Sequence, residues 1–162
     1  MTAPTTSYHL RPHSGWLNDP NGMTFRDGVW HVFFQHNPAA PQHRQIAWGH
    51  AVSDDLANWR LLPVAFGPTP GGPDAFGCWS GVFLTGHERP GVVYSGVTDE
   101  SGASTVCLRW GSPDLVTWDA PVVVAPTPDM DDIAVMRDPF VFELDGRPLA
   151  ILGAGRRDGT PV

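Results

Sequence analysis

Residues 53–59, Ser-Asp-Asp-Leu-Ala-Asn-Trp, return 59 residues later as residues 112–118, Ser-Pro-Asp-Leu-Val-Thr-Trp. The dipeptide Asp27-Gly28 returns as Asp145-Gly146, a shift of 118 residues and therefore twice the same interval. Another turn-like segment, residues 85–90, lies halfway between these two dipeptides. Self-similarity at a fixed period is typical of repeat architectures. The chain is therefore predicted to consist of units of about 59 residues.

Each unit is predicted to form strands. In the first unit, the segments 22–25 and 29–34 flank the Asp27-Gly28 turn, which is a hairpin signal. Prolines interrupt every candidate helix, and no segment shows a long 3.6-residue periodicity. The complete set of predicted strands is 22–25, 29–34, 46–53 and 59–64, then 81–84, 91–97, 105–110 and 121–124, then 140–144 and 149–152.

Four-stranded units that repeat along a chain favour the blades of a β-propeller. A β-sandwich of two stacked sheets is the alternative. We prefer the propeller because the turn and tryptophan motifs recur in register, as radial symmetry requires. Two blades and the start of a third do not close a ring of four to eight blades. We therefore expect residues 1–162 to be the front part of a longer domain, with bare sheet edges.

Composition and charge narrow the classes of protein. Gly 18 and Pro 17 together make up about a fifth of the 162 residues, well above their usual share of ~12%, which favours a turn-rich β protein. The chain has 10 Arg, no Lys and 17 acidic residues, a formal net charge of −7. Such a charge repels phosphate backbones and acidic lipid surfaces, and no apolar run approaches the ~20 residues of a membrane helix. We expect neither nucleic acid nor a membrane as partner.

The expected compartment is the cytoplasm. Residues 1–11 lack the basic-then-apolar pattern of a secretory signal. Two cysteines, Cys78 and Cys107, are too few for a disulfide framework or a zinc knuckle, and we expect both to be small buried apolar residues. The seven histidines include no metal-binding pattern, so no metal or other cofactor is expected.

Candidate site residues lie just before the predicted first strand of each unit. These segments are 16–22 (Trp-Leu-Asn-Asp-Pro-Asn-Gly), 78–81 (Cys-Trp-Ser-Gly) and 136–139 (Met-Arg-Asp-Pro). Because they lie about 60 residues apart, the same corner of three successive blades would carry them, and Asp19, Ser80 and Asp138 would converge on one channel. Two carboxylates facing one channel suit glycoside chemistry. The alternative is structural: Asp-Pro and Asn-Gly are ordinary turn dipeptides, and Arg137-Asp138 is an ordinary surface ion pair.

Five motifs together resemble glycoside hydrolase family 32, the invertase, levanase and inulinase family. They are residues 13–22, 34–38 (Phe-Gln-His-Asn-Pro), 48–53 (Trp-Gly-His-Ala-Val-Ser) with Asp55, Leu56 and Trp59, 79–81 (Trp-Ser-Gly) and 137–139 (Arg-Asp-Pro). They follow the family's order and spacing across nearly the whole chain. The resemblance implies an all-β, five-bladed propeller, with residues 1–162 as the N-terminal portion of a single catalytic domain.

The resemblance also implies an activity. A member of this family would cleave terminal β-D-fructofuranosyl bonds of sucrose, a short fructan or sucrose 6-phosphate. The cleavage would retain the configuration and proceed through a covalent fructosyl-enzyme. Asp19 matches the nucleophile and Asp138 the carboxylate that stabilises the transition state, while Arg137 would lower the pKa of nearby carboxylates. Asn18, Gln35 and Ser80 match positions that contact the fructose ring. The residues that match the apolar walls of the pocket are Trp16, Trp48 and Trp79.

Three tryptophans and one histidine also have a structural interpretation or depart from the family pattern. Trp59 and Trp118 recur with the repeat and are expected to pack the blades rather than the site. Trp48 suits the core nearly as well as a pocket wall. His43 lies where many members of the family carry a tryptophan, which would make the rim of the pocket more polar.

One departure from the family pattern concerns the general acid. The family's Glu-Cys motif is missing, and the chain ends 24 residues after Asp138. Glu88, Glu100 and Glu143 are the only glutamates, and we expect all three to be solvated. Without an acid the chain forgoes a typical 10²–10⁴-fold contribution. Residues 1–162 alone are therefore expected to hydrolyse no fructoside at a useful rate.

Two other functions stay open. A fructosyltransferase would use the same site with a sugar as the acceptor in place of water. A non-catalytic sugar-binding fragment would need neither the acid nor the acceptor side. A Glu-Cys dipeptide encoded downstream of Val162 would favour the enzyme, and a stop codon there would favour the fragment.

Overall fold

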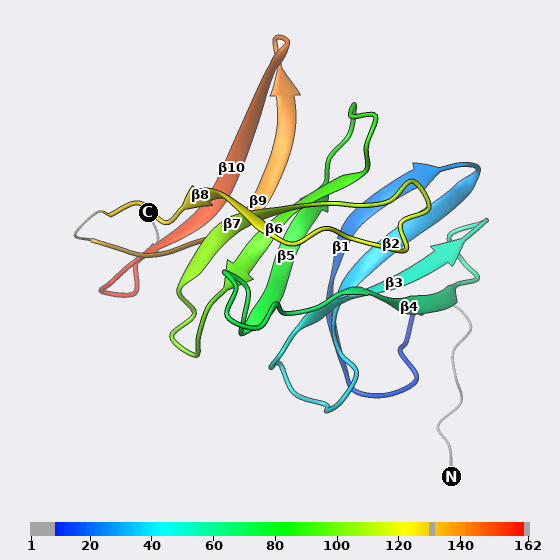
Figure 1. The fold of residues 1–162 in the computed structure, drawn as a ribbon, viewed down its shortest axis with the longest axis horizontal. Coiled ribbons are helices and arrows are strands. Elements are labelled where there is room, and N and C mark those ends of the chain that lie inside the picture. The colour runs from blue at the N-terminus through cyan, green and yellow to red at the C-terminus, as the bar shows by residue number, and fades with distance from the viewer. Residues whose placement is uncertain (1–8, 130–131, 161–162) are drawn as a thin grey trace.

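The computed structural model describes residues 9–129 and 132–160, which form strands connected by turns and loops (Figure 1). Residues 1–8 lie outside the described residues, so most of the segment that bears on a secretory signal is not described. Among the described residues, no helix is long and apolar enough to cross a membrane. The strands are β1 (Trp16–Arg26), β2 (Val29–Asn37), β3 (Ala47–Ser53), β4 (Arg60–Phe66), β5 (Gly77–Phe83), β6 (Gly91–Val97), β7 (Ser104–Trp110), β8 (Val122–Pro126), β9 (Ile133–Leu144) and β10 (Arg147–Arg156).

The strands form two complete blades and one further hairpin. Strands β1 to β4 make an antiparallel sheet in sequence order, β5 to β8 make a second, and β9 pairs with β10. The first strands of the three sheets lie next to one another, β1 beside β5 and β5 beside β9 (Figure 1). A two-sheet sandwich does not bring three first strands together in this way. The propeller prediction is confirmed, and the sandwich alternative is wrong.

The 59-residue repeat corresponds to one loop in each blade. Residues 53–59 join β3 to β4, and residues 112–118 join β7 to β8. In the first loop, the Asp55 carboxylate accepts hydrogen bonds from the backbone N–H groups of Ala57 and Asn58, at 2.9 and 2.7 Å. These bonds hold the pKa of Asp55 well below its usual range. The carboxylate of Asp114 accepts in the same way in the second loop, so the repeat is a side-chain-stabilised turn.

The Asp-Gly dipeptides form the tight turns of two equivalent hairpins. Asp27 and Gly28 have φ angles of 52° and 81°, and Asp145 and Gly146 have 52° and 73°. Two successive positive φ values define the type I′ turn, whose twist matches that of paired strands. The shift of 118 residues therefore joins the first hairpin of the first blade to that of the third.

The hydrophobic core lies between the first two blades. Phe33, Trp48 and Phe66 of the first blade pack against Val92 and Tyr94 of the second, together with Cys78, Cys107 and Leu115. Trp118 packs against this core, and Trp59 packs against a smaller cluster, as the repeat predicts. Cys78 and Cys107 are free and buried, as expected. The hairpin β9–β10 instead exposes apolar side chains, namely those of Phe140, Leu144, Leu149 and Ile151.

The first strands are longer than the sequence pattern predicts. Strand β1 begins at Trp16, β5 at Gly77 and β9 at Ile133, so the three motifs lie within these strands and not just before them. The hydrophobic pattern marked only the regular half of each strand. Prolines and polar residues, which usually indicate turns, concealed the irregular half.

Candidate active site

All three first strands are irregular at their motifs. The pairing of β1 with β2 skips Asp19, that of β5 with β6 skips Trp79 and Ser80, and that of β9 with β10 skips Asp138 and Pro139. Bulges of this kind turn a side chain out of the regular alternation and are common beside active sites. Asp19 and Asp138 also have φ angles of 28° and 58°. A positive φ at a residue other than glycine costs of order 1–3 kcal/mol, and it persists only where the surrounding structure imposes it.

A hollow of about 450 Å³ opens where the three bulges meet. The structure thus brings together Asp19, Ser80 and Asp138, the three residues predicted to converge. Each comes from a different sheet, and their side chains are exposed or half-buried. The full lining consists of Asp19, Pro20, Asn21, Ser80, Gly81, Val82, Asp138, Pro139 and Phe140.

Two donors hold the Asp19 carboxylate by one oxygen. Gln35 Nε2 donates to Asp19 Oδ2 at 3.1 Å, and Ser80 Oγ donates to the same oxygen at 3.0 Å. Gln35 Nε2 also donates to Ser80 Oγ, so the three side chains form a closed triangle. Gln35 is 3% exposed and lies behind the hollow on β2. Within the described residues, Asp19 Oδ1 has no hydrogen-bond partner, and it is left for a ligand.

Asp138 is held through its backbone instead. Its N–H donates to Ser95 Oγ at 2.7 Å, and the Ser95 hydroxyl donates to the Ser80 carbonyl oxygen at 3.3 Å. Burial raises the pKa of Asp138; the neighbouring Arg137 opposes this effect, and the Asp19 carboxylate adds to it. Arg137 thus lowers the pKa of Asp138, as expected, but burial outweighs this effect and the net shift is upward. Its Nε lies 3.5 Å from Asp138 Oδ2, and both side chains are about half exposed, so solvent screens the pair.

The predicted site residues Trp16, Asn18 and Trp79 are not among the residues that line the hollow, and they lie with His43 beside it in the chain's first two sheets. Trp16 Nε1 donates to Asn18 Oδ1 at 2.5 Å, and both side chains are partly buried at the start of β1. The Arg137 guanidinium lies 5.7 Å from the centre of the Trp79 ring. His43 lies against both indoles, with ring centroids 6.0 Å from Trp16 and 5.1 Å from Trp79.

Trp48 is the predicted wall residue that the structure places elsewhere. It is 0% exposed and packs in the core between the blades, against Phe66 and Tyr94. Its Nε1 donates to the Trp79 carbonyl oxygen at 3.1 Å, so it supports the bulge of β5 from behind. Strand β3 is buried along its whole length, because β2 and β4 flank it and the second blade covers it. Because Trp48 is buried in this strand, it belongs to the core and is not a wall of the pocket, contrary to the prediction from the sequence.

Sequence reasoning missed two polar residues of the site. Ser95 links the bulges of β5 and β9, and Asn21 lines the hollow and accepts a hydrogen bond from the Gly81 N–H at 3.4 Å. Among the described residues, the buried Nδ2 of Asn21 has no partner. Ser95 left a signal, because it is a polar residue inside the otherwise apolar run 91–97. Asn21 was treated as part of a turn.

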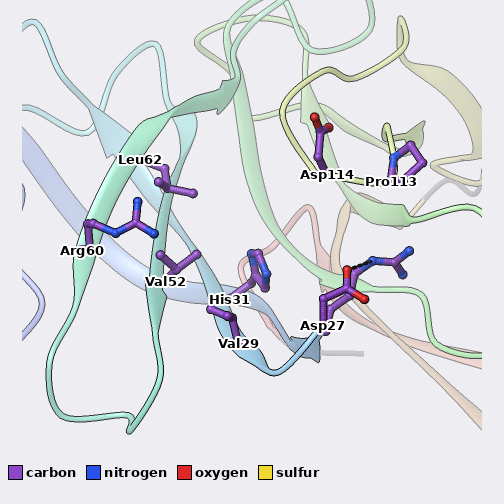
Figure 2. Close-up of a pocket in the computed structure, with 9 residues that line it drawn as sticks. Asp27, Val29, His31, Val52, Arg60, Leu62, Pro113 and Asp114 are labelled. Carbon is purple, nitrogen blue, oxygen red and sulfur yellow. Dashed lines mark ion pairs between the residues drawn. The ribbon is translucent and has the colours of Figure 1, made fainter.

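A second hollow, of about 250 Å³, lies by the Asp27-Gly28 turn and has a different chemistry (Figure 2). Figure 2 shows Val29, His31 and Val52 between Arg60 on one side and Asp27 on the other. The Asp27 carboxylate pairs with Arg26 at 3.7 Å, and that of Asp114 is engaged in its own loop. No two free carboxylates face each other here, so this hollow does not suit glycoside chemistry.

In the part of the chain that the structure describes, neither a metal-binding cluster nor a glutamate lies at the two carboxylates. No group of three His, Cys, Asp or Glu side chains that could hold a metal occurs within the described residues. Glu88, Glu100 and Glu143 are exposed, as expected, and none lines the 450 Å³ hollow. Glu100 forms an ion pair with Arg44 at 2.5 Å.

Fold and site together define a class: a β-propeller that presents two aspartates in a hollow at the bulged first strands of its blades. The family model for the glycosyl hydrolases family 32 N-terminal domain matches residues 9–161. The chain belongs to this family, whose enzymes are five-bladed β-propellers, and its strands cover about two blades of that fold.

Relatives and solved structures agree with this assignment. The chain is 34% identical to the β-fructofuranosidase insoluble isoenzyme 2 of Daucus carota, over 94% of this chain and 27% of that protein. It is 37% identical to the levanase of Bacillus subtilis, over 93% of this chain and 23% of that protein. The structure superposes on the sucrose-6-phosphate hydrolase of Lactobacillus gasseri with a TM-score of 0.80 and 29% identity, over 94% of this chain and 31% of the other.

The structure of a fructan exohydrolase is similar to that of this chain as well. The fructan 1-exohydrolase IIa of Cichorium intybus, solved in complex with 1-kestose, gives a TM-score of 0.78 at 36% identity, over 96% of this chain and 31% of the other. The chain thus spans less than a third of the length of each of these four relatives.

Proposed function

We propose that this chain supplies the nucleophile and the transition-state-stabilising carboxylate of a retaining β-fructofuranosidase. Its substrates are sucrose, a short fructan or sucrose 6-phosphate, in line with the names of its relatives. One observation carries the proposal: Asp19 and Asp138 line a single hollow from different blades, and the Asp19 carboxylate keeps one oxygen without a partner among the described residues.

Asp19 acts as the nucleophile through Oδ1. The bonds from Gln35 and Ser80 fix Oδ2, so the carboxylate cannot rotate freely, and its other oxygen has no hydrogen-bond partner among the described residues. In the first step a bond forms between Asp19 Oδ1 and C2 of the fructosyl unit, while the bond from C2 to the leaving oxygen breaks. A positioned nucleophile converts this displacement into an effectively intramolecular reaction.

Asp138 stabilises the positive charge that develops on the sugar ring. The bond from its backbone N–H to Ser95 holds the bulge, and the exposed carboxylate is free to accept hydrogen bonds from fructose hydroxyls. Preorganised charge of this kind costs no reorganisation during the reaction. Arg137 pairs with Asp138 and lies over the Trp79 ring, outside the lining of the hollow.

A natural leaving group needs a proton that this chain does not supply. None of its three glutamates lines the hollow, so residues 1–162 alone are proposed to hydrolyse sucrose at no useful rate. A leaving group that departs as a stable anion needs no such proton. This difference allows the nucleophile to be tested on the chain itself.

The test is to trap the fructosyl-enzyme. The chain is incubated with β-D-fructofuranosyl fluoride and quenched in acid, and its peptides are analysed by mass spectrometry. We expect one fructosyl unit esterified to Asp19. Asp19→Asn should remove the label, whereas Asp54→Asn, at an exposed loop position, should label like the wild type. A label on another residue, or no label on the wild-type chain, would contradict the proposal.

A further inference from the structure

His43 contacts the Trp16 and Trp79 rings and also the buried Gln35. Its Nε2 lies 3.1 Å from Gln35 Oε1. Its ring lies edge-on to Trp16 and tilted against Trp79. His43 itself is exposed, in the loop between β2 and β3, and does not line the hollow. Its contacts therefore reach Asp19 only through Gln35.

The hydrogen bonds of Gln35 require one orientation of its amide. Its Nε2 faces Asp19 Oδ2 and the Ser80 hydroxyl, while its Oε1 faces His43. A flipped amide would place its carbonyl oxygen against the Asp19 carboxylate, two acceptors with no proton between them. Oε1 can only accept, so His43 Nε2 must carry the proton. The Gln35 orientation that places its NH₂ group on Asp19 therefore goes with the Nε2–H tautomer of His43, which stabilises that orientation.

The loop that carries His43 is itself fixed at both ends. Near β2, the buried Asn37 accepts hydrogen bonds from the N–H groups of Ala39 and Ala40, and its Nδ2 donates to the Gln42 carbonyl at 3.1 Å. On the other side of His43, Arg44 pairs with Glu100 at 2.5 Å and lies over the Phe76 ring. His43 is thereby held between the first and second blades.

We propose that His43 is a positioning residue. Its Nε2–H donates to Gln35 Oε1, which turns the Gln35 amide so that its NH₂ group binds Asp19 Oδ2 and leaves Oδ1 to attack. The orientation of Gln35 follows from the geometry alone, whereas its consequence for attack rests on the proposed function of Asp19. Without the donor, Gln35 Oε1 loses its partner, the amide is held in this orientation only by its Nε2 bonds to Asp19 and Ser80, and the carboxylate is fixed less firmly.

Two variants separate the donor from the ring. His43→Phe keeps a flat ring between Trp16 and Trp79 but has no N–H group, whereas His43→Gln restores an N–H group without the ring. The rate at which β-D-fructofuranosyl fluoride labels the protein should fall about tenfold in His43→Phe, with little change in the substrate concentration that gives half the maximal rate. His43→Gln should recover most of the lost rate.

A spectroscopic measurement does not depend on any reaction. Long-range ¹H–¹⁵N correlation spectra of the wild-type protein at pH 8.5, where imidazoles are neutral, should show His43 protonated at Nε2. The proton on Nδ1 instead would overturn the proposal, even if the protein reacts with no fructoside. If labelling occurs but His43→Phe and His43→Gln react equally fast, the donor has no role and the proposal is also overturned.

Discussion

Asp19 and Asp74 both accept side-chain hydrogen bonds but lie in opposite surroundings. Asp74 is 0% exposed, and its Oδ2 accepts hydrogen bonds from Tyr94 at 2.6 Å and from Arg109 at 2.8 Å. Its Oδ1 accepts one from the Thr69 N–H at 3.0 Å. Asp19 is exposed, has a positive φ, and has bonds to one oxygen only. Both carboxylates have defined partners, but only Asp19 keeps acceptor capacity for a ligand.

The difference separates a buried structural carboxylate from the exposed carboxylate that we propose to be the nucleophile. Burial alone would raise the pKa of Asp74, but the bonds from Tyr94 and Arg109 outweigh it, and the pKa is lowered. Arg109 is 6% exposed and also donates to the Asp119 carbonyl at 2.9 Å, so the charge is paired and nearly every donor is used. A closed network of this kind stabilises the blade. The open network around Asp19 leaves one carboxylate oxygen without a partner among the described residues.

The largest effect on stability is expected from breaking the closed network. Arg109→Met leaves the Asp74 carboxylate buried without its cation, which costs about 3–5 kcal/mol in the free energy of unfolding. Urea denaturation measures the loss. Asp19→Asn, at the exposed carboxylate, should change the same quantity by less than about 0.5 kcal/mol, since asparagine also tolerates a positive φ. Equal losses in the two variants would remove the distinction between the two aspartates.

A smaller effect on stability is expected from the histidine pair of the first blade, in which His50 is buried and His31 is half-buried. His50 Nε2 lies 3.0 Å from His31 Nδ1, and burial, together with His31, lowers the pKa of His50 to about 4. The unfolded chain binds this proton near pH 6.5, so between pH 6.5 and 4 it binds more protons than the folded chain. Stability is therefore fully present above pH 6.5 and falls toward pH 4, by at most about 3 kcal/mol.

Urea denaturation at several pH values measures this slope. The lowered pKa of His31 acts in the same direction. His50→Phe preserves the stacking on Phe33, whose ring lies 4.4 Å away, and should remove most of the slope between pH 4 and 6.5. His87→Phe, at an exposed position, is the matched control and should leave the slope unchanged. An undiminished slope in His50→Phe would show that other groups produce it.

The smallest effect concerns the coupling of the two site carboxylates. Because the charge of Asp19 contributes to the raised pKa of Asp138, Asp19→Asn should lower that pKa. Carbon-13 NMR titration of the aspartate carboxyl groups detects the change, and Asp54→Asn should cause none. A pKa of Asp138 that is identical in Asp19→Asn and the wild type would mean that the two carboxylates do not share one hollow.

Much of the fold could be predicted from the sequence because its signals are local. The Asp55 and Asp114 loops and the two Asp-Gly turns are stabilised by residues within a few positions of one another, so a 59-residue repeat was visible in the chain itself. The convergence of Asp19, Ser80 and Asp138 followed from that repeat. The ends of the first strands could not be predicted from the repeat, because Pro20 and Pro139 lie at bulges, and a sequence pattern does not distinguish a bulge from a turn.

The sequence by itself determined the repeat, the hairpins and the three motifs, since each depends on short-range backbone preferences. Only the tertiary structure decided that Trp48 belongs to the core, that Ser95 joins two blades and that His43 holds Gln35. These facts depend on contacts between residues far apart in the chain. Burial and hydrogen bonding across blades exist only once the sheets have packed against one another.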